Sequence, residues 1–172
     1  MKKEKIIIIA SLIILIATIN ISCSSTKTVS IDQVTDTARI RSMINSQNFI
    51  FVPQYVSPMG FRRRYLTPDF DIRVSKDTIV SYLPFFGRGY TAPISPTDAD
   101  FDFTSTKFSY KMSETRKGWS ISIKPMDQHY LQELYFRIFS NGSASLNVIS
   151  IDKSFISYDG YIAARRIKEP KK

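Results

Sequence analysis

The sequence has very few of the residues on which many enzymes and metal proteins depend. Cysteine occurs once, at Cys23, and histidine once, at His129. A single cysteine cannot form a disulfide within the chain, so the fold must be stable without one. A lone histidine is more typical of a structural position, because catalytic and metal sites need several polar side chains together. We therefore predict no metal and no cofactor.

Glycine is also scarce, with six residues, whereas phenylalanine and tyrosine occur twelve and nine times. This composition argues against a disordered or fibrous protein and favours a packed globule. The sequence shows no internal repeat and no low-complexity tract. Residues 30–166 have the size of one ordinary domain, and we expect a single β-rich domain there, followed by a disordered basic tail at 167–172.

No apolar run in the sequence reaches the length of a membrane-spanning helix. The longest, at residues 6–21, follows the basic start "MKKEK" at 1–5. A transmembrane helix needs about 20 apolar residues, which is more than this run offers. A positive start, a short apolar middle and small residues at its end are typical of a secretory signal peptide, which we place at residues 1–22.

The segment that ends in Cys23 resembles a bacterial lipoprotein signal. Ser22 fits the small residue expected before the lipidated cysteine, although Asn20 stands where leucine is usual. The resemblance implies acyl chains, palmitate among them, on Cys23, with residues 23–29 as a lipidated polar tether to the membrane. The alternatives are an uncleaved anchor helix and a buried thiol.

The charge of the chain is strongly positive, with a formal net charge of +9. Loss of residues 1–22 removes three lysines and one glutamate and leaves +7. Nucleic acid is excluded as a partner because no nucleic-acid-binding motif is present and an exported protein seldom meets any. The dispersed charge either solvates the surface or attracts anionic lipid or glycolipid headgroups.

The spacing of apolar residues predicts one helix and about eight or nine strands. The helix is expected at about 31–46. In "DFDIRVS", residues 69–75, apolar and polar residues alternate, as in a strand that is buried on one face. The same alternation, or a short apolar run, recurs in "FIFVPQYV", "TIVSYL", "DFDFT", "KFSYKM", "WSISIK", "LQELYFRIF", "SASLNV" and "FISYDGYIA".

The connections between these strands are too short for the crossovers that parallel pairing requires. Asn141 and Gly142 give the strongest hairpin signal. We therefore predict a mainly β (α+β) fold: a single antiparallel meander that is curled or barrel-like, with the N-terminal helix packed against it.

Several segments resemble the domain-of-unknown-function family 4251. The likeness covers residues 49–164 and is most specific in "YLPFFGR" and "NGSA". It implies a small exported lipoprotein of Bacteroidota and brings no activity, cofactor or catalytic residue. Because "CSSTKTVSI" has no acidic residue before Asp32, we expect the periplasm-facing side of the outer membrane.

Residues 82–93, "YLPFFGRGYTAP", interrupt the alternation with prolines and glycines. One interpretation is a ligand-binding clamp in which an arginine meets an anion or a sugar while aromatic rings stack on it. The other is an irregular crossover whose rings close the core. The candidate ligand-binding residues are Arg88, Phe85, Phe86, Tyr90 and Tyr82.

Other chemistry has weaker support. Asp98, Asp100 and Asp102 alternate like the start of a calcium loop, but the later positions of an EF-hand are missing. The arginines at 62–64 form with Arg88 either an anion-binding face or solvated surface. We expect a non-enzymatic binding module for an envelope protein or small molecule. The alternative is a carboxylate-based hydrolase or glycan-active enzyme.

Overall fold

The computed structural model describes residues 31–90 and 100–164, which belong to one compact unit that begins at Ile31. The predicted signal peptide, Cys23, the tether and the basic tail lie outside the described residues. Within the described part, no helix combines the length and the apolar character that crossing a membrane requires.

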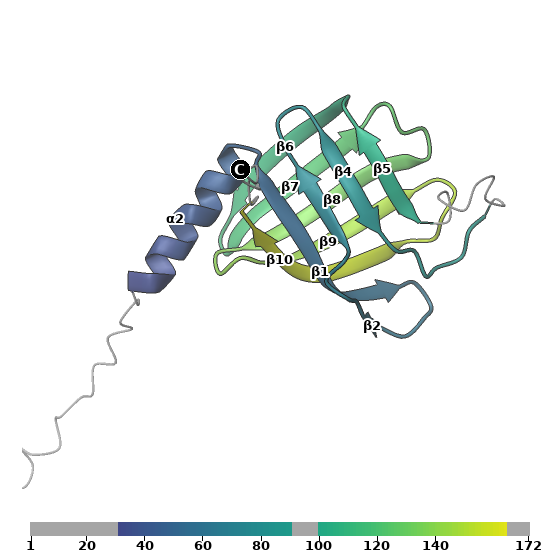
Figure 1. The fold of residues 1–172 in the computed structure, drawn as a ribbon, viewed down its shortest axis with the longest axis horizontal. Coiled ribbons are helices and arrows are strands. Elements are labelled where there is room, and N and C mark those ends of the chain that lie inside the picture. Colours follow the sequence, from purple (N-terminus) through teal and green to yellow (C-terminus); the bar gives the residue numbers. More distant parts are fainter. Residues whose placement is uncertain (1–30, 91–99, 165–172) are drawn as a thin grey trace, which may run out of the picture. The chain divides into compact units, whose positions relative to one another are not determined.

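In the described part of the chain, one helix, α2 (Ile31–Asn45), precedes the sheet, close to the predicted range. Its C-terminal half buries Ile40, Met43 and Ile44 in the core. Shortly after its end Gln47 has a φ of 51°, the left-handed conformation that often follows a helix. Figure 1 shows the helix beside one end of the sheet.

Ten strands follow the helix and form one antiparallel sheet. All nine strands expected from the sequence are present, and the two-residue β2 is the addition. The strands are β1 (Phe49–Pro58), β2 (Arg64–Tyr65), β3 (Asp71–Val74), β4 (Ile79–Leu83), β5 (Phe101–Ser105), β6 (Phe108–Thr115), β7 (Gly118–Pro125), β8 (Leu131–Phe139), β9 (Ser143–Ser150) and β10 (Ile156–Ala163).

The sheet is curled into a barrel-like body, as the strand order and the short link between its two edge strands indicate. The order is β5-β4-β3-β1-β10-β9-β8-β7-β6, with β2 paired to β1 alone. The two edge strands, β5 and β6, are joined by residues 106 and 107 only. Because so short a link spans roughly 10 Å, the two edges of the sheet must meet at this corner. Over residues 31–90 and 100–164, the structure confirms the predicted mainly β fold with one helix.

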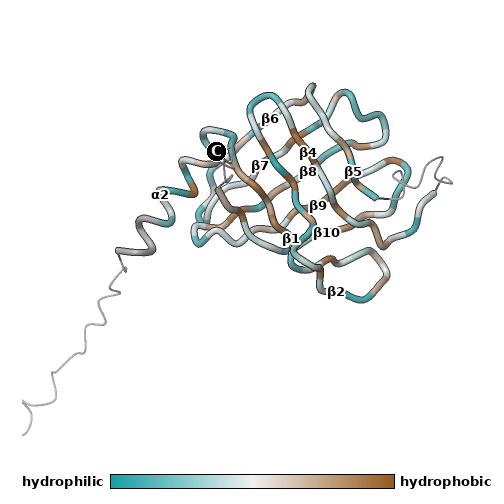
Figure 2. Tube along the Cα trace, viewed as in Figure 1, coloured by the Kyte–Doolittle hydropathy of each residue, from teal (hydrophilic) through white to brown (hydrophobic). Residues whose placement is uncertain are grey.

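The interior of the barrel-like sheet is filled by large apolar side chains. Phe49 and Phe51 each pack edge-on against Phe136, with ring centroids 5.9 and 5.7 Å apart. All three rings are fully buried, as is Tyr158. Figure 2 shows hydrophobic colours along the strands and hydrophilic colours in many of the turns. Contacts with a ligand therefore fall on the outside of the sheet or at its ends.

The hairpin expected at Asn141 and Gly142 is present. The amide of Gly142 donates to the carbonyl of Phe139, 2.9 Å away, and Gly142 has a φ of 84°. Asn141 keeps a negative φ and instead accepts from the amide of Ser143 through its side-chain oxygen, at 3.1 Å. One residue of the pair, not both, uses the left-handed region.

Candidate functional site

The segment 84–90, which carries most of the predicted ligand-binding residues, is anchored at its start by buried polar groups. The hydroxyl of Tyr158 donates to the carbonyl of Pro84, at 2.8 Å. The amide of Phe85 donates to a carboxylate oxygen of Asp100, also at 2.8 Å. Burial, and next the negative charge of Asp100, raise the pKa of Tyr158 well above its ordinary value, so its hydroxyl remains a donor.

The second half of the segment pairs with the connection between β9 and β10. Gly89 forms an isolated antiparallel bridge with Lys153. The Ser154 hydroxyl accepts from the Arg88 amide at 3.0 Å, and the Ser154 amide donates to the Arg88 carbonyl at 2.9 Å. The amide of Tyr90 donates to the carbonyl of Asp152, at 2.7 Å. The backbone of the segment is thus fixed even where its side chains are exposed.

The five candidate residues do not converge on Arg88. Phe85 packs edge-on against Phe101, with centroids 5.5 Å apart, and belongs to the border of the core. Phe86 has its ring under the guanidinium of Arg64, 5.1 Å away. Tyr82 stacks on Phe70 at 5.4 Å on the outside of the sheet. Arg88 and Tyr90 are exposed and point their side chains to solvent.

The structure therefore splits the predicted clamp into two groups. Phe85 and Phe86 are partly buried and pack against the core, as the crossover interpretation predicts. Tyr82, Arg88 and Tyr90 are exposed and remain available to a ligand. Their role in binding stays a prediction.

Lys153 is a buried charged residue that sequence reasoning missed. Its side chain is only 7% exposed, and its ammonium lies 5.0 Å from the ring centroids of Phe101 and Tyr130 and 5.9 Å from that of Phe85. The Asp152 carboxylate is 3.8 Å away, and the carbonyl of Asp100 accepts at 3.4 Å. Aromatic faces and a carboxylate are the partners that make a buried cation tolerable.

Lys153 links the candidate segment to β5 and to the residue before β8. Phe85 follows β4, Phe101 begins β5 and Tyr130 precedes β8. In the sequence, "IDKS" has the composition of an exposed turn, so nothing local marks its lysine as buried. The burial comes from rings that are distant in the chain.

The carboxylates of the described residues serve separate, local roles. Asp71 pairs with Arg73 at 2.9 Å, and Asp102 is exposed on the outer face of β5. Of the three aspartates that resemble a calcium loop, Asp98 lies outside the described residues and Asp100 accepts from Phe85. Among residues 31–90 and 100–164, no three His, Cys, Asp or Glu side chains are grouped as metal ligands would be.

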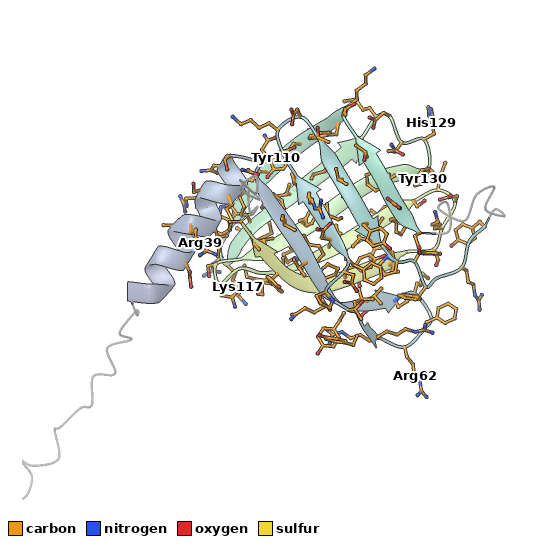
Figure 3. The ribbon with its side chains drawn as sticks, viewed as in Figure 1. Arg39, Arg62, Tyr110, Lys117, His129 and Tyr130 are labelled. Atoms are coloured by element: carbon orange, nitrogen blue, oxygen red, sulfur yellow. The ribbon has the colours of Figure 1, made fainter. Side chains whose placement is uncertain are left out.

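His129 lies in the connection between β7 and β8 and is exposed. Figure 3 shows it and Tyr130 at the same side of the molecule, away from α2. In the same connection the Asp127 carboxylate accepts hydrogen bonds from Ser105, Thr106 and Lys107, at 2.5, 2.8 and 3.1 Å. These bonds, that from the Ser105 hydroxyl first, lower the pKa of Asp127 to about 2.

The fold and these groups define a class of small, mainly β proteins with one helix against a ten-stranded antiparallel sheet. The model of a family described as a domain of unknown function (DUF4251) matches residues 31–162. The chain belongs to the DUF4251 family.

A solved structure supports the fold. The chain is similar to the crystal structure of a DUF4251 family protein from Bacteroides eggerthii DSM 20697, with a TM-score of 0.56 and 10% identity. The match covers 77% of this chain and 91% of that one. No curated protein matches the chain.

Proposed function

We propose that the protein is an exported lipoprotein, held through acyl chains on Cys23 at the periplasm-facing side of the outer membrane, whose domain is a non-enzymatic binding module. The N-terminal sequence supports the anchor, because its basic start, short apolar run and Ser22–Cys23 pair are typical of a lipoprotein signal. Several acyl chains on one residue make attachment to the membrane effectively permanent.

One observation carries the binding role: exposed side chains stand on a rigid segment of backbone. Arg88 and Tyr90 project from a segment fixed by hydrogen bonds to Asp152 and Ser154. Tyr82 is 47% exposed on the adjoining strand β4. A fixed backbone loses little conformational entropy on binding, and tyrosine side chains add contact area at a low entropy cost, which is what a binding face requires.

The anchor is tested by a Cys23→Ala variant expressed with a fatty-acid probe. We expect labelling of the wild-type protein and of a Ser24→Ala control, and complete loss in Cys23→Ala, because the thiol is the acyl acceptor. Labelling that persists in Cys23→Ala would refute the lipid anchor.

The binding face is tested by a thermal-shift screen of the protein with sugars, lipids and divalent ions. Stabilisation by one class of compound that is lost in Arg88→Ala and kept in Arg39→Ala supports the face around Arg88. Arg39 is the matched control because it is an exposed arginine on α2 (Figure 3). Equal loss of stabilisation in Arg88→Ala and Arg39→Ala contradicts a binding face around Arg88. Stabilisation that neither substitution affects also contradicts it.

A further inference from the structure

The connection between β1 and β2 exposes an unusual set of side chains. Met59, Phe61 and Tyr65 are 65, 45 and 67% exposed. Methionine, aromatic residues and arginine are enriched at the centres of protein–protein interfaces, whereas lysine and acidic residues are depleted. We give the name arginine–aromatic hairpin to seven of its exposed residues, none of which is a lysine or an acid: Tyr55, Met59, Phe61, Arg62, Arg63, Arg64 and Tyr65.

The hairpin is held rigidly. Its last strand, β2, pairs with β1 through Tyr55–Tyr65 and Val56–Arg64. The next residue, Leu66, is buried, and its amide donates to the carbonyl of Gln54 at 2.8 Å. A rigid surface loses little entropy when it binds a partner.

One arginine of the hairpin is paired with a carboxylate, and two are not. Arg63 pairs with Asp159 at 2.9 Å and stacks over Tyr55 at 4.1 Å. No carboxylate of the described residues lies within 4.0 Å of Arg62 or Arg64. Figure 3 shows Arg62 pointing away from the sheet. The guanidinium groups of Arg62 and Arg64 therefore favour a partner that supplies carboxylates.

The backbone of β2 favours a polypeptide over other anionic partners. In the described part of the chain β2 pairs with β1 alone, so its other edge has no strand beside it. Such an edge can accept an extended segment through main-chain hydrogen bonds. A lipid headgroup or a phosphate ion would use the arginines but not this edge.

We propose that the arginine–aromatic hairpin is the docking surface for an extended acidic segment of a partner protein. Carboxylates of the segment pair with Arg62 and Arg64, its backbone lies along β2, and Tyr65 and Phe61 supply apolar contact. This inference deepens the proposed binding role by naming the partner, and it does not depend on lipidation of Cys23.

The test is fluorescence anisotropy with a labelled oligoglutamate peptide and the full chain in detergent. We expect binding that weakens with added salt, and an affinity at least about tenfold lower in Arg62→Glu/Arg64→Glu. The matched control is Lys111→Glu/Lys117→Glu, which makes the same change of charge at exposed residues of β6 and the β6–β7 turn. Figure 3 shows Lys117 away from Arg62. The control should lose less than about threefold.

A single Arg62→Glu variant separates the surface from the fold, because the side chain of Arg62 forms no hydrogen bond, ion pair or ring contact with the described residues. It should lose affinity while keeping the thermal unfolding of the wild type. Equal losses in the arginine and lysine variants overturn the proposal, as does the absence of peptide binding. Binding to phosphatidylglycerol vesicles or inorganic phosphate in place of the peptide overturns the choice of a protein partner.

The same measurement distinguishes this inference from the binding face around Arg88. Peptide binding that is lost in Arg88→Ala but kept in Arg62→Glu/Arg64→Glu contradicts the hairpin and leaves the proposed binding role intact. Loss of peptide binding both in Arg88→Ala and in Arg62→Glu/Arg64→Glu supports the hairpin. The peptide then lies across the hairpin and the face around Arg88, which the contact between Arg64 and Phe86 connects.

Discussion

Lys153 shows how this fold buries a cation. The side chain passes between the rings of Phe85, Phe101 and Tyr130, and its ammonium faces the carboxylate of Asp152. Each cation–π contact is worth roughly 0.5–2 kcal/mol, while desolvation of the ammonium opposes it. The aliphatic part of the side chain also fills space between the rings. Packing therefore stabilises the fold at this residue. The charge has two opposing effects, because the cation–π contacts are favourable and the desolvation of the ammonium is unfavourable.

The two contributions can be separated by substitution. Lys153→Ala should lower the free energy of unfolding by about 2–4 kcal/mol, because it leaves a cavity among three rings. Lys153→Met keeps the length and apolar volume, and should cost less than about 1.5 kcal/mol because the desolvation penalty disappears with the charge. Urea unfolding measures both. Equal losses in the two variants would show that the charge, and not the packing, is what stabilises this site.

The β1–β2 hairpin is the element that the sequence pattern predicts least well. β2 has two residues, both exposed, and so shows no alternation that a sequence pattern could reveal. Leu66, immediately after it, is 4% exposed and is the apolar residue that attaches the hairpin to the core. Besides its pairing with β1, the hairpin is held by this one buried side chain and by the Arg63–Asp159 pair.

Leu66→Ala tests this attachment. We expect a loss of about 2–4 kcal/mol in the free energy of unfolding, because truncating a buried leucine removes apolar contact and leaves a cavity. Thr67→Ala, a change at the exposed neighbour, should stay within about 0.5 kcal/mol of the wild type. Hydrogen exchange of β2 amides should accelerate in Leu66→Ala alone. Unchanged exchange would show that other contacts hold the hairpin.

At the scale of the whole molecule, the corner between β5 and β6 decides whether the sheet closes. Asp127, from the β7–β8 connection, accepts hydrogen bonds from three consecutive residues of that corner. The amide of Met126 also donates to the carbonyl of Lys107, at 2.7 Å. The two edges of the sheet are thus fastened to a third connection, and not to each other by strand pairing.

The pKa of Asp127 makes this fastening sensitive to acid. Its folded pKa is about 2, below the ordinary value of 3.8, so its contribution to stability is complete above about pH 4. That contribution is lost as the pH falls from 3.8 through 2, because the protonated carboxyl is a weaker acceptor. Asp127→Asn should therefore be less stable than the wild type at neutral pH, and the difference should narrow below about pH 3. Urea unfolding across this range is the measurement.

A Ser109→Ala variant on β6 is the control for the acid series, since it leaves all titrating groups in place. Its difference from the wild type should not vary with pH. A difference between Asp127→Asn and the wild type that is constant from neutral to acid pH would contradict the role of the charge.

The alternation of side chains was enough to predict the strands and their antiparallel arrangement. In β3 the buried Ile72 and Val74 alternate with Asp71 and Arg73, as predicted. In β6 the pattern predicts burial of Met112, yet it is 36% exposed, because this end of the strand extends past the covered part of the core. A local pattern gives the face of a residue but not whether another element covers that face.

The candidate site was harder to predict than the fold. Prolines and glycines in 84–90 marked the segment correctly as irregular, while the binding role of its exposed Arg88 stays a prediction. What the sequence could not reveal is the partner of each ring. Phe86 contacts Arg64 of the β1–β2 hairpin, and Phe85 contacts Lys153 of the β9–β10 connection. These segments are distant in the chain and are brought together only by the curled sheet.

The pairing of β1 with β10 has a kinetic consequence. It joins Ile50 to Ala163 and Pro58 to Ile156, so about a hundred residues must be ordered or looped out before the two strands can meet. The hairpins from β6 to β10 involve near neighbours and can form early, whereas this long-range pairing is slow. Until it forms, β1 presents an unpaired hydrophobic edge, which makes the half-folded chain prone to aggregation.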